Sequence, residues 1–212
     1  MKILIASTNS HKVREYSSLL QAIPDVRILD LNHYPDYLPP DENETSFEAN
    51  AVLKASHAAN SLQILTLADD GGLVIPALQG EPGLYSRRYA GPKATDSENI
   101  QKILKKISLL SDTDRSAYFV CALALASPGH LEKCVVATCQ GEVLNQPRGN
   151  YGFAYDKIFL KNGYNKTFGE LEESIKNKIS HRYKAFLMLL PTLQTCLKSD
   201  TNKNTFYKKE KV

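Results

Sequence analysis

The chain has 212 residues, of which 42% are hydrophobic and 23% are charged, and its formal net charge is +3. A hydrophobic share of this size excludes a disordered chain, and the length suits a single large domain with a sizeable core. Residues 198–212 account for the whole net charge, with five lysines against two acids. The body of the chain is therefore neutral, and nothing in it indicates a nucleic acid partner.

The sequence also argues against membrane and secreted classes. Its apolar runs are too short to span a bilayer, and the N-terminus lacks the pattern of a signal peptide. The four cysteines lack metal-ligand spacing and lie in apolar or helical stretches. We therefore expect a cytoplasmic protein with reduced cysteines and no membrane partner.

The first part of the chain alternates strands with helices. A strand is predicted at residues 2–6, and a polar turn at 7–12 leads into a helix with apolar residues at helical spacing. A second strand is predicted at 26–31, followed by an acidic, proline-rich loop at 32–44. The order indicates an α/β arrangement from the start of the chain.

A second helix is predicted from the pattern of Thr45 and Glu48, which have the spacing of a capping box. This helix is expected to run to about residue 60, with Asn50, Lys54 and His57 on one face. Later elements are strands at 64–68 and 73–77, a helix capped by Thr95 and Glu98, a hairpin at 115–127 and 131–143, a strand at 157–160, and a mostly helical segment at 171–197 with a kink or break at Pro191. Together they predict an α/β fold with a mixed sheet over residues 1–197 and a polar, lysine-rich tail at 198–212.

Two adjacent aspartates, Asp69 and Asp70, follow the apolar run Leu65–Ala68 and precede two glycines. Paired carboxylates at the end of a buried strand repel each other unless a cation or a proton joins them. The pattern is therefore compatible with a metal-assisted site. It is equally compatible with a strand-to-turn junction, where Asp and Gly are common.

The turn Ser7–Lys12 joins a predicted strand to a predicted helix. Free N–H groups at a helix start, hydroxyl groups and the Lys12 ammonium suit a phosphate, although the glycines of a P-loop are missing. A plain helix cap is the alternative. The acidic residues Asp41–Glu44 would add a metal carboxylate to Asp70, since Mg²⁺ needs only one or two carboxylates beside substrate phosphates, or would form a solvated loop.

Towards the C-terminus, aromatic and polar residues recur in a pattern that suits a nucleobase. Phe153 offers a stacking face and Asp156 an acceptor, while His181 and Arg182 offer donors. Each of these residues has a structural alternative, such as a buried ring or a helix cap. Combined with the phosphate and metal candidates, they indicate a nucleotide site.

Six segments in order give this pattern its specificity: 6–12, 46–55, 68–73, 83–91, 152–156 and 179–182. In these segments the chain resembles the inosine triphosphate pyrophosphatase family, whose members hydrolyse non-standard purine nucleoside triphosphates. The resemblance extends from Ile3 to about Leu190. It implies an elongated α/β/α architecture with a long mixed sheet, two lobes that flank a nucleotide cleft, and a homodimer.

The resemblance also implies roles for single residues. Asp70 would be the general base and a Mg²⁺ ligand, with Asp41 or Glu42 as the second metal carboxylate. Substrate binding would fall to Ser7, Thr8, Asn9, Ser10, His11, Lys12, Lys54, Gly71, Phe153, Ala154, Tyr155, Asp156, Lys176, His181 and Arg182. The implied reaction releases pyrophosphate from ITP, dITP or XTP. The alternatives are a pyrophosphatase for modified or pyrimidine triphosphates and a nucleotide-binding module without catalysis.

Several residues depart from the family pattern. Gly71 stands where a Ser is common, His11 where a Gly precedes the lysine, and Ala154 where a Gly is common. Arg87 and Arg88 lie in a matching segment but receive no role from it. These positions concern individual contacts of the site and leave the expected reaction unchanged.

Overall fold

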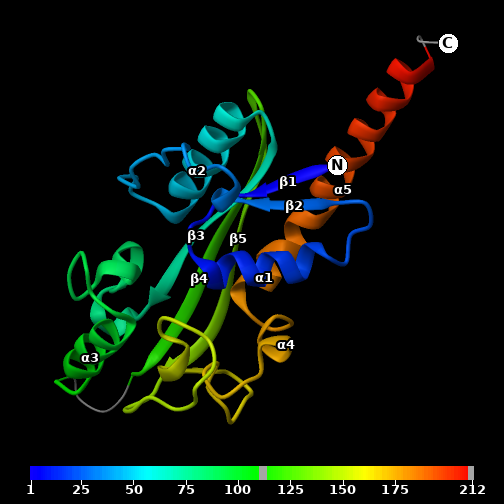
Figure 1. Ribbon diagram of the computed structural model, residues 1–212. Helices are drawn as coiled ribbons and strands as arrows, with labels where there is room; N and C mark the ends of the chain where they lie inside the picture. Colours follow the sequence, from blue (N-terminus) through cyan, green and yellow to red (C-terminus); the bar gives the residue numbers. More distant parts are fainter. Residues whose placement is uncertain (110–113, 210–212) are drawn as a thin grey trace.

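The computed structural model describes residues 1–109 and 114–209, with side chains up to Lys198. Its centre is a six-stranded sheet with the strand order β2-β1-β3-β4-β5-β6 (Figure 1). The strands are β1 (Lys2–Ile5), β2 (Arg27–Asp30), β3 (Leu65–Val74), β4 (Ser116–Ser127), β5 (His130–Val143) and β6 (Phe159–Lys161). β1 pairs in parallel with β2 and β3, while β3, β4, β5 and β6 pair antiparallel, so the predicted mixed sheet is confirmed.

Helices cover both faces of this sheet. They are α1 (Ser10–Leu20), α2 (Phe47–Leu62), α3 (Asp96–Ile107), α4 (Glu173–Lys176) and α5 (His181–Lys209). α1 and α5 pack on one face through Tyr16, Leu20, Phe186 and Leu189. α2 packs on the other face through an alanine surface that meets alanines of β3 and β4. Small side chains on both sides let this helix approach the sheet closely.

A second packing region lies at the other end of the long strands. α3 contributes Ile100 and Ile103, which pack with Phe119 of β4 and with Tyr155 and Phe168 of the later loops. Figure 1 shows α3 beside the lower half of β3, β4 and β5, well away from α2 and α5. The long strands thus connect two lobes, as the resemblance implied. None of the helices in the described ranges is long and apolar enough to cross a membrane.

Three boundaries differ from the sequence predictions. β3 is one continuous strand, so the aspartates lie within it and no turn separates residues 64–68 from 73–77. α2 is capped by Ser46, whose hydroxyl accepts from the Ala49 N–H at 3.1 Å, and the predicted Thr45 cap is wrong by one position. The last strand begins at Phe159, after a 3₁₀ turn at Asp156–Ile158.

The C-terminal helix α5 continues through Pro191, where a kink or break was expected. Proline removes one N–H from the helix, and the carbonyl that loses this donor belongs to Leu187, an exposed residue. The helix runs on to Lys209, well into the predicted tail. Residues 210–212 of that tail lie outside the described part of the chain.

Candidate active site

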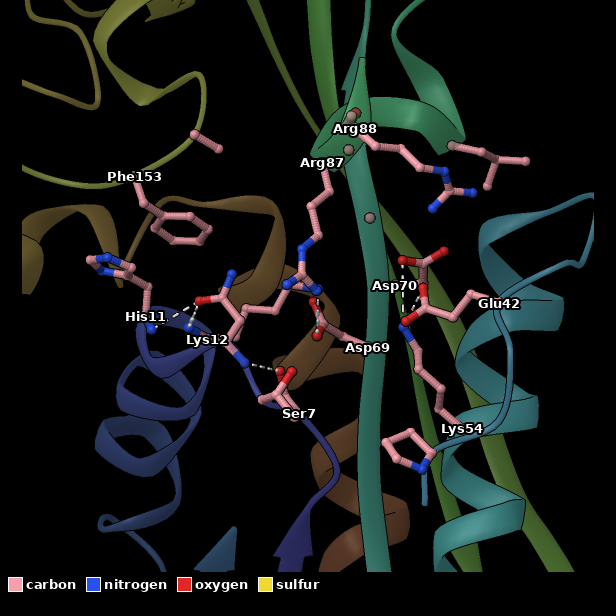
Figure 2. A pocket seen from close by; sticks show the side chains of 18 of the residues that line it. Ser7, His11, Lys12, Glu42, Lys54, Asp69, Asp70, Arg87, Arg88 and Phe153 are labelled. Carbon is pink, nitrogen blue, oxygen red and sulfur yellow. Dashed lines mark hydrogen bonds and ion pairs between the residues drawn. The ribbon is translucent and has the colours of Figure 1, made fainter. Parts of the chain in front are cut away.

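The two adjacent aspartates face different sides of β3. Successive side chains of a strand point to opposite faces, and β3 is continuous here. Asp69 contacts Lys12 of α1 and Arg182 of α5, whereas Asp70 contacts Lys54 of α2. Figure 2 shows the two carboxylates on either side of the strand, each with its own lysine. The two aspartates therefore have different hydrogen-bond and ion-pair partners on the two sides of one strand.

Asp70 lies with groups from α2 and the acidic loop. Its carboxylate accepts a hydrogen bond from Asn50 Nδ2 at 3.1 Å and lies 3.5 Å from Lys54 Nζ. Glu42 lies 3.3 Å from the same Lys54 Nζ. Burial raises the pKa of Asp70 above its ordinary value, Lys54 and Lys12 oppose this shift, and Glu42 and Asp69 add to it. A carboxylate that is destabilised as an anion accepts a proton more readily.

The pKa of Asp69 is shifted in the opposite direction to that of Asp70. Its carboxylate lies 3.0 Å from Lys12 Nζ and 3.1 Å from Arg182 Nε, and the side chain is buried. Burial alone would raise the pKa of Asp69, but the charges of Lys12, Arg182 and Lys54 outweigh it and lower that pKa to about 2. Asp69 thus remains an anion at neutral pH and fixes Lys12 at the end of the phosphate turn.

A buried chain of charges continues from Arg182. Its Nη1 donates to Glu15 of α1 at 3.1 Å, and Glu15 also lies 2.9 Å from Lys176 Nζ. Lys176 in turn donates to Asp156 at 2.5 Å. Sequence reasoning assigned no role to Glu15. Lys176, which the resemblance assigns to substrate binding, is absent from the residues that line the cavity, and its ammonium pairs with Asp156.

The loop at 152–156 is shaped by local hydrogen bonds. Asp156 Oδ2 accepts from the Phe153 N–H at 2.9 Å, and Gly152 adopts φ +71° where a β-carbon would lie 2.2 Å from that oxygen. Ala154 adopts φ +49°, a conformation that usually favours glycine, and its N–H donates to Asp96 of α3 at 2.7 Å. The loop is therefore held by a hydrogen bond within itself and by one to α3.

His181 is buried and stacks on Phe119, with ring centroids 4.7 Å apart and an interplanar angle of 11°. Burial lowers the pKa of His181 well below its ordinary value, and the nearby charges of Arg182 and Lys176 lower it further. The ring is thus neutral at pH 7. Its Nδ1 atom has no hydrogen-bond partner among the described residues, which leaves it available to a ligand.

The phosphate turn is also a helix cap, so both readings of Ser7–Lys12 are compatible with the structure. Asn9 Oδ1 accepts from the N–H groups of His11 at 3.0 Å and Lys12 at 3.3 Å. Ser7 accepts from the Asn9 N–H at 3.2 Å. Ser10 does not line the cavity, unlike the rest of the turn.

These groups surround one cavity of about 910 Å³. Apart from Ser10 and Lys176, every residue that the sequence suggested for the site lines it, including Asp41 and Glu42. The cavity is also lined by Arg87 and Arg88 from the 3₁₀ turn Gly83–Arg88, and both are exposed. Figure 2 shows these two arginines in the upper part of the view, above Lys12 and Lys54.

A divalent cation would be held by few protein ligands here. Within the described ranges, no group of three or more His, Cys, Asp or Glu side chains could hold a metal. Asp70 and Glu42 nevertheless approach the same Lys54 ammonium from two sides. Mg²⁺ commonly takes one or two carboxylates and completes its coordination with water and phosphate oxygens, so this pair fits such an ion. Asp41 makes no comparable contact with Lys54.

Gly71 lies on the cavity wall within β3. A β-carbon at this position would come within 2.3 Å of the Val120 carbonyl oxygen of β4. The serine that is common in the family would require the two strands to move apart. The close approach of β4 thus explains why glycine, and not serine, stands at position 71 in this chain.

Comparison with known proteins shows the family to which this chain belongs. The model of the Ham1 family matches residues 3–192. The dITP/XTP pyrophosphatase of Protochlamydia amoebophila is 50% identical over 92% of this chain and 98% of its own length, and that of Chlamydia trachomatis serovar L2 is 45% identical over 93% and 95%. The solved HAM1 protein from Coxiella burnetii aligns with a TM-score of 0.83 and 37% identity over 92% of this chain and 99% of its own. The resemblance seen in the sequence is confirmed, and the chain belongs to the Ham1 family.

Proposed function

We propose that this protein hydrolyses non-standard purine nucleoside triphosphates such as dITP, ITP and XTP to the nucleoside monophosphate and pyrophosphate. Its relatives at 45–50% identity carry the name dITP/XTP pyrophosphatase. The observation that carries the proposal is the division of charges along β3. One cavity contains a lysine-bearing helix start for phosphates and a separate carboxylate, Asp70, whose raised pKa suits a base.

The phosphate chain would bind along the wall formed by Lys12 and Lys54. The first turn of α1 contributes N–H groups and the positive end of a helix dipole. Lys12 and Lys54 each face a carboxylate at present, so the protein holds them in place before the substrate arrives. Such preorganisation avoids the cost of reorienting charges during the reaction.

Asp70 would act as the general base. A water molecule loses its proton to Asp70, its oxygen bonds to the α-phosphorus, and the bond from this phosphorus to the bridging oxygen breaks. Pyrophosphate leaves with the electron pair of that bond. A divalent metal, which we propose to be Mg²⁺ held by Asp70 and Glu42, supplies charge neutralisation for the phosphates when bound. Asn50, which donates to Asp70, orients the carboxylate.

Selection of the base would depend on His181 and Arg182. The neutral imidazole has one donor and one acceptor nitrogen, and the Arg182 guanidinium keeps Nη2 unpaired within the described part of the chain. The 6-oxo group of hypoxanthine or xanthine accepts from such donors, whereas the amino group of adenine opposes them. Each buried mismatch costs about 1–3 kcal/mol, so two contacts would reject adenine strongly.

Pyrophosphate release from dITP, ATP and a set of pyrimidine triphosphates tests the proposal. We expect turnover of dITP with Mg²⁺ and at least about 10³-fold less with Asp70→Asn, because that variant lacks the base. Asp36→Asn, an exposed acid outside the cavity, serves as the control. A preference for pyrimidine or methylated substrates would favour the related pyrophosphatase. Binding of dITP without turnover would favour a nucleotide-binding module.

The assembly and the location are proposals of the same kind. We propose a homodimer that takes a small-molecule nucleotide, as the resemblance implies. We also propose that it is cytoplasmic and binds no nucleic acid, as the composition and the neutral body of the chain indicate. Sedimentation velocity on the purified chain tests the dimer. A monomer at working concentration would contradict it.

A further inference from the structure

Phe153 is the aromatic ring on which a base would stack, yet His11 already occupies it. The two rings lie with centroids 4.8 Å apart and an interplanar angle of 12°, which is a stacked arrangement. Figure 2 shows the His11 ring next to that of Phe153 at the edge of the cavity. Two flat groups cannot share one ring face. A base that stacks on this face of Phe153 must therefore move His11.

The remaining surroundings of Phe153 are also occupied. Lys176 Nζ lies 4.7 Å and the Arg182 guanidinium carbon 5.2 Å from its ring centroid, both within the range of cation–π contacts. Lys176 and Arg182 are buried and fixed by ion pairs with Glu15, Asp156 and Asp69. They cannot yield to a ligand without breaking these pairs. His11, by contrast, is exposed and makes no ion pair with the described residues.

His11 is free to leave. Its side chain is exposed and extends from the first turn of α1, and only its backbone N–H is tied, to Asn9 Oδ1. A rotamer change therefore exposes the ring of Phe153 without loss of the helix cap. A base between the two rings would instead need a centroid separation of roughly 7 Å, twice an ordinary stacking distance of about 3.5 Å.

We propose that His11 is a built-in competitor for the base: it covers the stacking face of Phe153 in the free protein, and the base of the substrate replaces it. The proposal rests on the proposed function, since it takes Phe153 as the stacking partner of a base. If His11 covers Phe153 in most molecules, only the remaining molecules can stack the base. The apparent affinity is then the intrinsic affinity multiplied by the fraction of molecules in which Phe153 is uncovered. One aromatic pair is worth enough to account for an about two- to tenfold effect on affinity.

The loss of affinity caused by His11 can be distinguished from other effects by three properties. It applies equally to every base, so it alters the affinity for dITP and XTP by the same factor and leaves their ratio unchanged. It does not apply to inorganic tripolyphosphate, which has no base to stack. It also disappears when Phe153 is replaced, because there is then no ring for His11 to cover.

The test compares His11→Ala with the unaltered protein and with His130→Ala, which removes an exposed histidine at the start of β5 outside the cavity. We expect His11→Ala to lower KM for dITP and XTP about two- to tenfold with little change in kcat. His11→Phe should raise KM, since a larger ring holds Phe153 more firmly. In a Phe153→Leu background the His11 substitution should have no effect.

Calorimetry separates this inference from the proposed function, because binding needs no turnover. Affinity for dIMP should improve in His11→Ala, while affinity for tripolyphosphate should stay the same. Weaker dIMP binding in His11→Ala would overturn the proposal, since His11 would then be part of the base site. Equal improvement for both ligands would also overturn it. Absence of dITP hydrolysis by the unaltered protein would instead refute the proposed function.

Discussion

Replacing Glu15 tests the buried charge chain behind the cavity. Its carboxylate joins Arg182 and Lys176, and all three side chains are at most 7% exposed. Glu15→Ala leaves two buried cations short of a partner. Removal of one member of a buried ion pair costs about 3–5 kcal/mol. In a domain of this size each kcal/mol shifts Tm by about 2–4 °C, so Tm should fall by about 6–20 °C.

Thermal unfolding followed by circular dichroism measures this loss, and Glu173→Ala is its matched control. Glu173 of α4 pairs with Arg14, the neighbour of Glu15 in α1, at 3.9 Å, and 46% of the Glu173 side chain is exposed. An exposed pair of this kind contributes at most about 1 kcal/mol. If Glu15→Ala and Glu173→Ala lowered Tm by the same small amount, the buried chain would not stabilise the fold as argued.

Three further predictions follow from the site. Burial opposes ionisation of Glu15, but its ion pairs with Arg182 and Lys176 outweigh this and lower its pKa below the ordinary value of 4.5. The stability that ionised Glu15 contributes is therefore present above pH 4.5 and is lost as the pH falls through the lowered pKa. The Tm difference between the unaltered protein and Glu15→Gln should shrink as the pH falls over that range. Glu42→Gln should raise the Mg²⁺ concentration needed for half-maximal activity, whereas Asp41→Asn should not; the reverse result would assign the metal to Asp41. Gly71→Ser should cost about 1–3 kcal/mol in urea unfolding because its β-carbon meets the Val120 carbonyl, and an unchanged midpoint would show that β4 can shift.

Local patterns in the sequence predicted the elements well. The Thr95–Glu98 capping box is present as expected, with the Glu98 N–H donating to Thr95 Oγ1 at 3.3 Å. The hairpin of β4 and β5 also lies within a residue of its predicted limits. Both depend on neighbours in sequence. The cap of α2 was misplaced because Thr45 and Ser46 are adjacent and both are good capping residues.

The buried partners of the site could not be predicted in this way. Glu15 and Arg182 are 167 positions apart, and no periodicity links them. Glu15 lies beside the buried Tyr16, and a carboxylate next to an apolar helix face is a weak signal of a distant cation. The resemblance assigns Lys176 to substrate binding but does not indicate its buried partners. Its ammonium pairs with both Glu15 and Asp156.

The two adjacent aspartates show that distant partners, and not neighbours in sequence, decide the chemistry of a residue. As a turn, Asp69 and Asp70 would share one environment and compete for one cation. Because β3 continues through them, one faces Lys12 and Arg182 and the other faces Lys54 and Asn50. The stronger cationic surroundings lower the pKa of Asp69, while burial raises that of Asp70. Two identical neighbours thus become a fixed anion and a proton acceptor, since alternate positions of a strand meet different helices.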